Sequence, residues 1–252
     1  MIHLSVAGLL LTLLVSQPSG QAQKKAPTDK QKPPTSFTEK MLKFLGISNS
    51  PGTLKAPGDV TSGEIWLADL QAMSTRALTS SDSYRSPIFL AGNKDVLALR
   101  GDDVVRAASS ASGEVKKLYA VSGILKLVGV SSEDSATVLI LLRGEAGGHP
   151  RVGLLTVGTG AVTPVPYDPA SGQDLQMVEN LGGWLRTYGD RQIYVRKQSK
   201  QALSGTVEWS DVFLQVEGQP SVDVSQCDGV NCGQPSLSPD GHWLVFVRTK
   251  GE

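Results

Sequence analysis

One stretch of the chain occurs twice, and this repetition restricts the fold more than any other feature of the sequence. Residues 234–248 read QPSLSPDGHWLVFVR and align without a gap on residues 86–100, which read SPIFLAGNKDVLALR. Two weaker copies end in Arg143 and Arg196. The closing arginines of the four copies are 43, 53 and 52 residues apart, a period at which the repeated unit is a small four-stranded sheet.

Beyond residue 60 the chain reads as a series of short strands. Runs of Val, Ile, Leu and aromatic residues alternate with Gly, Asp, Ser and Pro, and no sustained helical periodicity interrupts them. Each unit is therefore expected to be four short antiparallel strands. The expected first halves, besides residues 86–100, are Leu125–Val130 with Val138–Arg143 and Trp184–Tyr188 with Gln192–Arg196. The expected second halves are Asp103–Ala107 with Glu114–Val121, Arg151–Val157 with Ala161–Val165, and Asp211–Val216 with Pro220–Ser225.

The two ends of this region complement each other. Glu64–Leu70 followed by Arg76–Thr79 is a second half without a first, whereas Pro235–Arg248 is a first half without a second. Joining these halves into one sheet would close a radial array and remove its free edge. The sequence thus predicts an all-β fold, a β-propeller with about four blades. The poorly patterned stretch Tyr167–Asn180 leaves room for a further strand.

The repeats also resemble a known family. Pro235–Phe246 has the pattern P-x-φ-S-P-D-G-x-x-φ-φ-φ, and with Ile65–Leu70 and the ending Arg76–Thr79 it resembles the WD40-like repeat of TolB-type propellers. The resemblance implies a propeller domain, which we expect over residues 58–252, with more blades than the four visible here. Ala91–Asn93 departs from the S-P-D-G turn. The motif residues, expected to have structural roles, are Ser238, Pro239, Asp240, Gly241, Trp66 and Asp69.

The N-terminus reads as a secretory signal. Ile2–Val15 is uncharged and rich in Leu, Val and Ala, but it is too short to span a bilayer. Small residues at Gly20 and Ala22 suit a signal peptidase, so we expect cleavage after Ala22 and a mature chain that starts at Gln23. Residues 1–22 are therefore interpreted as a signal peptide, and the mature protein, without a transmembrane segment, as periplasmic or secreted.

Two short segments separate the signal from the propeller. Residues 23–35 contain four Lys, three Pro and no aliphatic side chain larger than Ala, a composition expected to remain disordered. Residues 36–46 begin with a capping box at Ser36 and Glu39 and end at Gly46, which predicts a short amphipathic helix over 37–45. Its apolar face is expected to pack on the main domain. A membrane surface or a partner protein is the alternative.

Charge and cysteine content restrict the partners and the compartment. The chain has 24 Lys and Arg against 24 Asp and Glu, so no net charge attracts it to a nucleic acid. We expect a protein partner, no nucleic-acid partner and a monomer. Cys227 and Cys232 frame a loop containing Asp-Gly, and in an exported protein they are expected to form a disulfide worth about 2 kcal/mol. Two ligands of a zinc site are the alternative.

No catalytic residue, cofactor or metal ligand is expected from the sequence. The mature chain has only His149 and His242, and neither accompanies a Gly-x-Ser-x-Gly elbow. Five carboxylates lie in predicted turns, where solvated turn residues are favoured over calcium binding or acid–base chemistry: Asp102, Asp103, Glu133, Asp134 and Asp240. Four tryptophans are expected to pack between blades, with sugar stacking as the alternative: Trp66, Trp184, Trp209 and Trp243.

Two functional hypotheses remain, from different classes. The first is a non-enzymatic scaffold whose ring face or loops bind another protein or a cell-envelope component, as the TolB resemblance implies. The second is a propeller that binds a small ligand or carbohydrate, or hydrolyses a substrate, at its central channel. The placement of Asp102, Asp134, Asp190, Asp240 and the four tryptophans discriminates between them. Convergence of three or more at one mouth of the channel favours the second hypothesis, whereas scatter around the rim favours the first. A third hypothesis makes this chain the N-terminal propeller of a larger enzyme.

Overall fold

The computed structural model describes residues 61–110, 114–131, 134–144, 150–165 and 185–249. All of them belong to one unit of the chain, Thr35–Glu252. The expected signal peptide (1–22), linker (23–35), helix (37–45) and the stretch Tyr167–Asn180 lie outside the described residues. Within these residues there is no helix with the length and hydrophobicity needed to cross a membrane.

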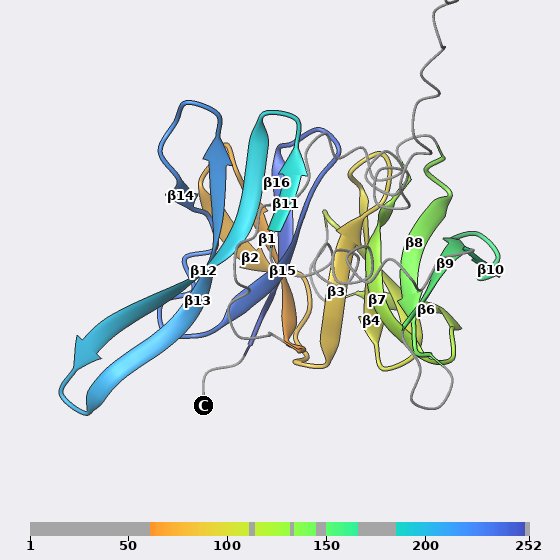
Figure 1. Ribbon diagram of the computed structural model, residues 1–252, viewed down its shortest axis with the longest axis horizontal. Coiled ribbons are helices and arrows are strands. Elements are labelled where there is room, and N and C mark those ends of the chain that lie inside the picture. Colours follow the sequence, from red (N-terminus) through yellow and green to blue (C-terminus); the bar gives the residue numbers. More distant parts are fainter. Residues whose placement is uncertain (1–60, 111–113, 132–133, 145–149, 166–184, 250–252) are drawn as a thin grey trace, which may run out of the picture. The chain divides into compact units, whose positions relative to one another are not determined.

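The described chain forms four antiparallel sheets of four strands each (Figure 1). The first contains β3 (Tyr84–Phe89), β4 (Asp95–Arg100), β5 (Asp103–Ala108) and β6 (Val115–Ala120). The second contains β7 (Ile124–Val130), β8 (Thr137–Leu142), β9 (Arg151–Thr156) and β10 (Val162–Pro164). The third contains β11 (Leu185–Tyr188), β12 (Arg191–Ala202), β13 (Gly205–Val216) and β14 (Val222–Asp223). The fourth, which we call the split sheet, contains β15 (Cys232–Leu237), β16 (Trp243–Arg248), β1 (Glu64–Asp69) and β2 (Ser74–Ala77).

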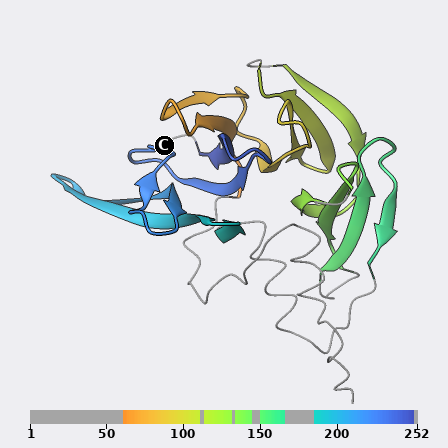
Figure 2. The same cartoon turned by 90° about the horizontal axis from the view of Figure 1, so that it is seen from above.

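The first strand of each sheet lies innermost. β15 contacts both β3 and β11, and β3 contacts β7, so neighbouring sheets meet along these edges. Figure 2 shows the sheets following one another in the order β11–β14, split sheet, β3–β6 and β7–β10. Four-stranded antiparallel sheets that meet at their first strands are the blades of a β-propeller. The all-β propeller class predicted from the repeats is thereby confirmed, with four blades in the described part of the chain.

The split sheet joins the two ends of the described chain. β1 pairs with β16 in a register that runs from Glu64 opposite Arg248 to Asp69 opposite Trp243. This pairing confirms the prediction that the half at residues 64–79 completes the half at residues 235–248.

The split sheet is buried on both faces, which explains why β16 is apolar at four consecutive positions. Val245 and Val247 belong to the cluster that contains Val96 of the β3–β6 blade, whereas Phe246 belongs to the cluster that contains Ile193 of the β11–β14 blade. These three side chains of β16 are fully buried. A strand covered on both sides gains from each apolar residue, about 1.5–3 kcal/mol for a large side chain.

The two best-matched repeats share the same backbone irregularity. Ser86 and Gln234 both have a positive φ, 51° and 53°, and both precede a proline, Pro87 and Pro235. Each lies where the pairing of the innermost strand with its neighbour shifts register. The backbone N–H of Ser86 donates a hydrogen bond to Oε1 of Gln234, which links β3 to β15. The gapless alignment of the two segments therefore reflects the same bulged strand in two blades.

The arginines that close the repeats lie over aromatic rings. In three of the four blades the guanidinium is placed above a ring on a neighbouring strand, a cation–π contact worth about 0.5–1 kcal/mol at an exposed site. The distances from guanidinium carbon to ring centroid are 6.0 Å for Arg100 over Tyr84, 3.7 Å for Arg196 over Phe213 and 4.4 Å for Arg248 over Trp66. In these three blades the repeated arginine thus packs on an aromatic ring of an adjacent strand.

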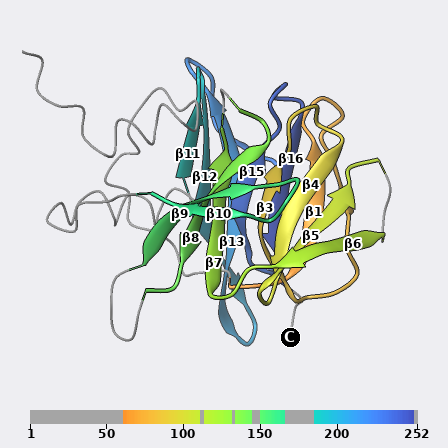
Figure 3. The same ribbon diagram turned by 90° about the vertical axis from the view of Figure 1, so that its right-hand side faces the viewer.

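The predicted strands of the third blade were wrong in length. β12 and β13 each have twelve residues, whereas the sequence predicted Gln192–Arg196 and Asp211–Val216. The last strand, predicted as Pro220–Ser225, is only Val222–Asp223. The added parts of β12 and β13 form a hairpin, here called the arm (residues 197–210), which projects beyond β11 and β14 (Figures 1 and 3). The prediction missed the arm because its strands pair with each other and contain no run of apolar residues.

Gly63 should tolerate no side chain, because a Cβ built on it lies 2.3 Å from the backbone oxygen of Arg248. We expect Gly63→Ala to lower the free energy of unfolding by about 1–3 kcal/mol, since β1 and β16 must separate to admit the methyl group. Urea titration measures the change. Gly158→Ala is the matched control, because a Cβ there meets no atom within 4 Å. Equal losses in the two variants would contradict the tight approach of the two chain ends.

Candidate functional site

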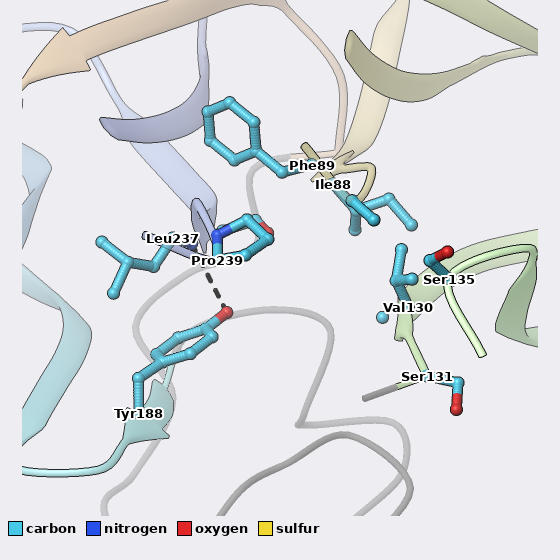
Figure 4. Close-up of a pocket in the computed structure, with 11 residues that line it drawn as sticks. Ile88, Phe89, Val130, Ser131, Ser135, Tyr188, Leu237 and Pro239 are labelled. Atoms are coloured by element: carbon cyan, nitrogen blue, oxygen red, sulfur yellow. Dashed lines mark hydrogen bonds between the residues drawn. The ribbon is translucent and has the colours of Figure 1, made fainter. Parts of the chain in front are cut away.

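A pocket lies where the innermost strands of all four blades end. Its lining combines the ends of β3, β7, β11 and β15 with residues of the adjoining turns (Figure 4). The volume is about 290 Å³. The lining residues are Ile88, Phe89, Ala91, Gly129, Val130, Ser131, Ser135, Tyr188, Ser236, Leu237 and Pro239.

The pocket is apolar with a few hydroxyl groups. None of its lining residues carries a charge. The Tyr188 hydroxyl accepts a long hydrogen bond, 3.4 Å, from the backbone N–H of Leu237 and so joins the β11–β14 blade to the split sheet. The Ser131 hydroxyl accepts a hydrogen bond of 3.1 Å from the N–H of Asp134. Such a site can bind an uncharged group that fills an apolar space and makes one or two hydrogen bonds.

The S-P-D-G turn borders this pocket and is fixed by its own side chains. Oδ1 of Asp240 accepts hydrogen bonds from the Ser238 hydroxyl and from the N–H of His242. Burial raises the pKa of Asp240, but these hydrogen bonds outweigh it and lower the pKa below its ordinary value. Gly241 has a φ of 72° and its carbonyl accepts a hydrogen bond of 2.6 Å from Arg191. The motif thus shapes the turn and attaches the β11–β14 blade to it.

Asp134 and Asp69 have the same kind of role in other turns. The carboxylate of Asp134 accepts hydrogen bonds from the Thr137 hydroxyl and from the N–H of Ala136, and these lower its pKa. Oδ1 of Asp69 accepts from the N–H groups of the two residues at positions 71 and 72, in the turn between β1 and β2. Carboxylates engaged in this way stabilise turns.

None of the candidate carboxylates or tryptophans within the described residues lines the pocket. Asp134, Asp190 and Asp240 lie in the turns that follow β7, β11 and β15, next to lining residues, but none of them lines the pocket. Asp102 lies in the turn between β4 and β5. The tryptophans at 66 and 243 pack against the two clusters beside the split sheet. Glu133, His149 and Trp184 lie outside the described residues. Three of the named carboxylates thus lie in turns at the same end of the innermost strands as the pocket, but their side chains are not part of its wall, so this placement leaves both functional hypotheses standing.

Cys227 and Cys232 form a disulfide in the structure, with a Cα–Cα distance of 6.3 Å. Both cysteines are fully buried, and they close the loop that leads from β14 to β15. The Ser210 hydroxyl donates a hydrogen bond of 2.9 Å to the carbonyl oxygen of Cys232. Across the described residues, no group of three or more His, Cys, Asp or Glu side chains is arranged to hold a metal ion.

Asp211 is a buried carboxylate beside this loop, at the base of the arm. Its oxygens accept hydrogen bonds from the N–H of Cys227 at 2.9 Å, from Nε1 of Trp209 at 2.6 Å and from the Ser225 hydroxyl at 3.3 Å. Burial raises the pKa of Asp211 and outweighs the opposing effect of the hydrogen bonds; the nearby charge of Asp223 raises it further. The side chain holds the disulfide loop against β13.

The sequence did not single out the pocket or Asp211. Every innermost strand nevertheless ends in a residue that lines the pocket: Phe89, Val130, Tyr188 and Leu237. Val130 and Tyr188 also end strands that the repeats predicted, and Phe89 and Leu237 occupy the same position in the two aligned segments, so comparing the strand ends would have found the pocket. For Asp211 no such signal exists, because its burial depends on a loop from a later part of the chain.

Comparisons with known proteins give similarities among solved structures only. No family model matches the chain, and no curated protein matches it. The chain is similar to a putative TolB from Agrobacterium tumefaciens, with 16% identity, 75% of this chain and 62% of that chain covered, and a TM-score of 0.36. It is also similar to the β-propeller domain of the Trilobed protease from Pyrococcus furiosus, described as having an open velcro topology. There the identity is 10%, the coverage 77% of this chain and 80% of that one, and the TM-score 0.27. The chain thus spans less than two thirds of the TolB structure.

The burial of Asp211 predicts a pH dependence of stability. A raised pKa means that the folded state binds the proton more tightly than the unfolded state, so this contribution is full below the ordinary carboxyl pKa and falls as pH rises through the raised value. Asp211→Asn keeps an acceptor for Cys227 and has no proton to lose. We therefore expect the stability of the wild type minus that of Asp211→Asn to fall as pH rises from about 3 to 7.

Chemical denaturation at a series of pH values measures this difference. The new amide faces the Trp209 N–H and adds an offset that does not depend on pH. Asp134→Asn is the control of opposite sign, because the pKa of Asp134 is lowered and its stabilisation is lost as pH falls. A flat difference for Asp211→Asn would contradict the raised pKa.

Proposed function

We propose that this protein is an exported, non-enzymatic β-propeller that binds another protein or a cell-envelope component through the pocket at the ends of its innermost strands. The observation that carries the proposal is the convergence of all four blades on one uncharged, apolar cavity. Its volume of about 290 Å³ is at the lower limit for small-molecule sites, which measure about 300–1,000 Å³. One or two apolar side chains of a partner fit this size and chemistry.

The hydroxyls of the pocket favour binding over hydrolysis. A serine nucleophile needs a base within hydrogen-bond reach. The residues that line the described pocket include three serines but no His, Lys, Asp or Glu. The same hydroxyls support a second candidate function, the binding of a small uncharged ligand that hydrogen-bonds to Tyr188 and the serines.

Export accords with the disulfide, since such bonds persist in oxidising compartments. We propose cleavage after Ala22, which releases a mature chain that starts at Gln23. Edman sequencing or intact mass of protein recovered from a secreting host should give this N-terminus. Recovery of a chain that retains residues 1–22, in the cytoplasmic fraction, would contradict the proposal.

Filling the pocket should abolish partner binding. Ser135 is exposed at the rim, so Ser135→Trp can be accommodated without disturbing the core and places an indole over the cavity. We expect at least about a tenfold loss of the captured partner, equivalent to about 1.4 kcal/mol, when the tagged protein is incubated with an envelope extract of its host.

Ser122→Trp is the matched control. Ser122 is an exposed serine just before β7, at the other end of the strand that leads to Ser131. Thermal unfolding should show that both variants remain folded. Undiminished capture by Ser135→Trp would exclude the pocket as the docking site, whereas loss of capture by both variants would place the site elsewhere on the propeller.

A further inference from the structure

The arm has an open edge along β13. β14 pairs with β13 only at Phe213 and Leu214. Val212 still directs its backbone toward that side, because its N–H donates to the Ser225 hydroxyl and its carbonyl accepts from the N–H of Val224. No described strand other than β12 pairs with β13 from Gly205 to Ser210. The blade therefore loses its outer neighbour where the arm begins.

The open edge has backbone groups available for pairing. The N–H and C=O groups of alternate residues in a strand point to the same side. The backbone N–H and C=O groups of Val212 point outward, and the pairing of β13 with β12 has no register shift. The backbone groups of Thr206, Glu208 and Ser210 therefore point outward as well. Val207 and Trp209 then share one face of the arm, while Thr206 and Glu208 share the other.

This edge has few of the features that prevent strand addition. It contains no proline, and Glu208 is its only charged residue, whereas the opposite strand has lysines at 197 and 200. The side chain of Val207 is 41% exposed, and Leu203 at the tip is fully exposed. An uncovered edge of this composition is a template for pairing with another strand.

We propose that the arm pairs with the arm of a second copy of this chain, in an antiparallel β13–β13 contact whose two-fold axis passes beside Val207. This contact places Val207 opposite its counterpart, Trp209 opposite Gly205, and Thr206 opposite Glu208. The indole then covers a residue without a side chain, and the threonine hydroxyl can donate to the carboxylate. The fit of the indole over Gly205 and the hydrogen bond between threonine and carboxylate therefore make the edge complementary to itself.

Other two-fold registers are less favourable. A two-fold axis perpendicular to the sheet places side chains of the same face opposite each other. One residue must therefore lie opposite its own counterpart, and the axis passes between the two. Centred on Glu208, it would place two carboxylates opposite each other, which is destabilising. Centred on Trp209, it would extend the pairing to Asp211, which the disulfide loop already contacts. The Val207-centred register is the one that uses residues 205–209 and no more.

The inference depends on the arm and not on the pocket, and it replaces the monomer expected from the sequence. A contact of about five residues is smaller than a standard interface, so the dimer should form in a concentration-dependent equilibrium. Sedimentation velocity of the mature protein over about a hundredfold range of concentration should show this equilibrium. A monomer throughout that range would overturn the proposal and leave the edge to a strand from another protein.

Two proline variants test which edge is used. Glu208→Pro removes an outward N–H from the β13 edge, and we expect at least a tenfold weaker dimer because the symmetry doubles the lost hydrogen bonds. Ser199→Pro is the matched control, since Ser199 pairs with Glu208 at the same depth in the arm but lies on the β12 edge. It should leave the dimer unchanged. Equal effects of the two variants, in either direction, would overturn the proposal.

Cysteine cross-linking tests the register. Opposite residues of a non-hydrogen-bonded pair have Cα atoms about 4.5 Å apart, a distance that a disulfide can span. Val207→Cys should therefore form a covalent dimer under mild oxidation, visible on a non-reducing gel. Thr206→Cys should not, because its counterpart lies beyond about 7 Å in this register. Cross-linking of Thr206→Cys but not of Val207→Cys would contradict the proposed axis.

Discussion

The pairing of β1 with β16 is the constraint on which the rest of the propeller depends. The other blades are built from consecutive strands, whereas this one joins segments separated by almost the whole described chain. Two core clusters share the split sheet, one with the β3–β6 blade and one with the β11–β14 blade. Loss of the pairing would therefore expose apolar surface on both sides. The entropy of closing so long a loop grows only slowly with its length, so buried β-strand pairing can offset it.

The pocket and the turns around it depend on each other. The aspartates at 134 and 240 are engaged in hydrogen bonds with their own turns. These hydrogen bonds hold the two carboxylates within their turns. The cavity wall is therefore formed by apolar side chains and hydroxyl groups at the strand ends. In the proposed binding role, this pocket would select a partner by shape and apolar contact at its centre and by charge only at its margin.

The repeats were sufficient to predict the blades but not the functional surfaces. Gln234–Arg248 and Ser86–Arg100 aligned because strand, turn and strand recur with the same bulge, and such local patterns are visible in one sequence. The split sheet followed from two incomplete halves. The arm could not be predicted from the repeats, because its strands Lys197–Gln201 and Thr206–Ser210 are mostly polar and, among the described strands, pair only with each other. The burial of Asp211 could not be predicted either, because it arises from contacts with the disulfide loop, which comes later in the chain.

The split sheet also determines when the protein can finish folding. Among the described strands, β1 is the first to be synthesised and β16 is the last. One edge of β1 therefore has no pairing partner until almost all of the described chain has been made. During synthesis the early blades remain without their covering sheet. Pairing of β1 with β16 is then a late, cooperative step in the folding of the described strands.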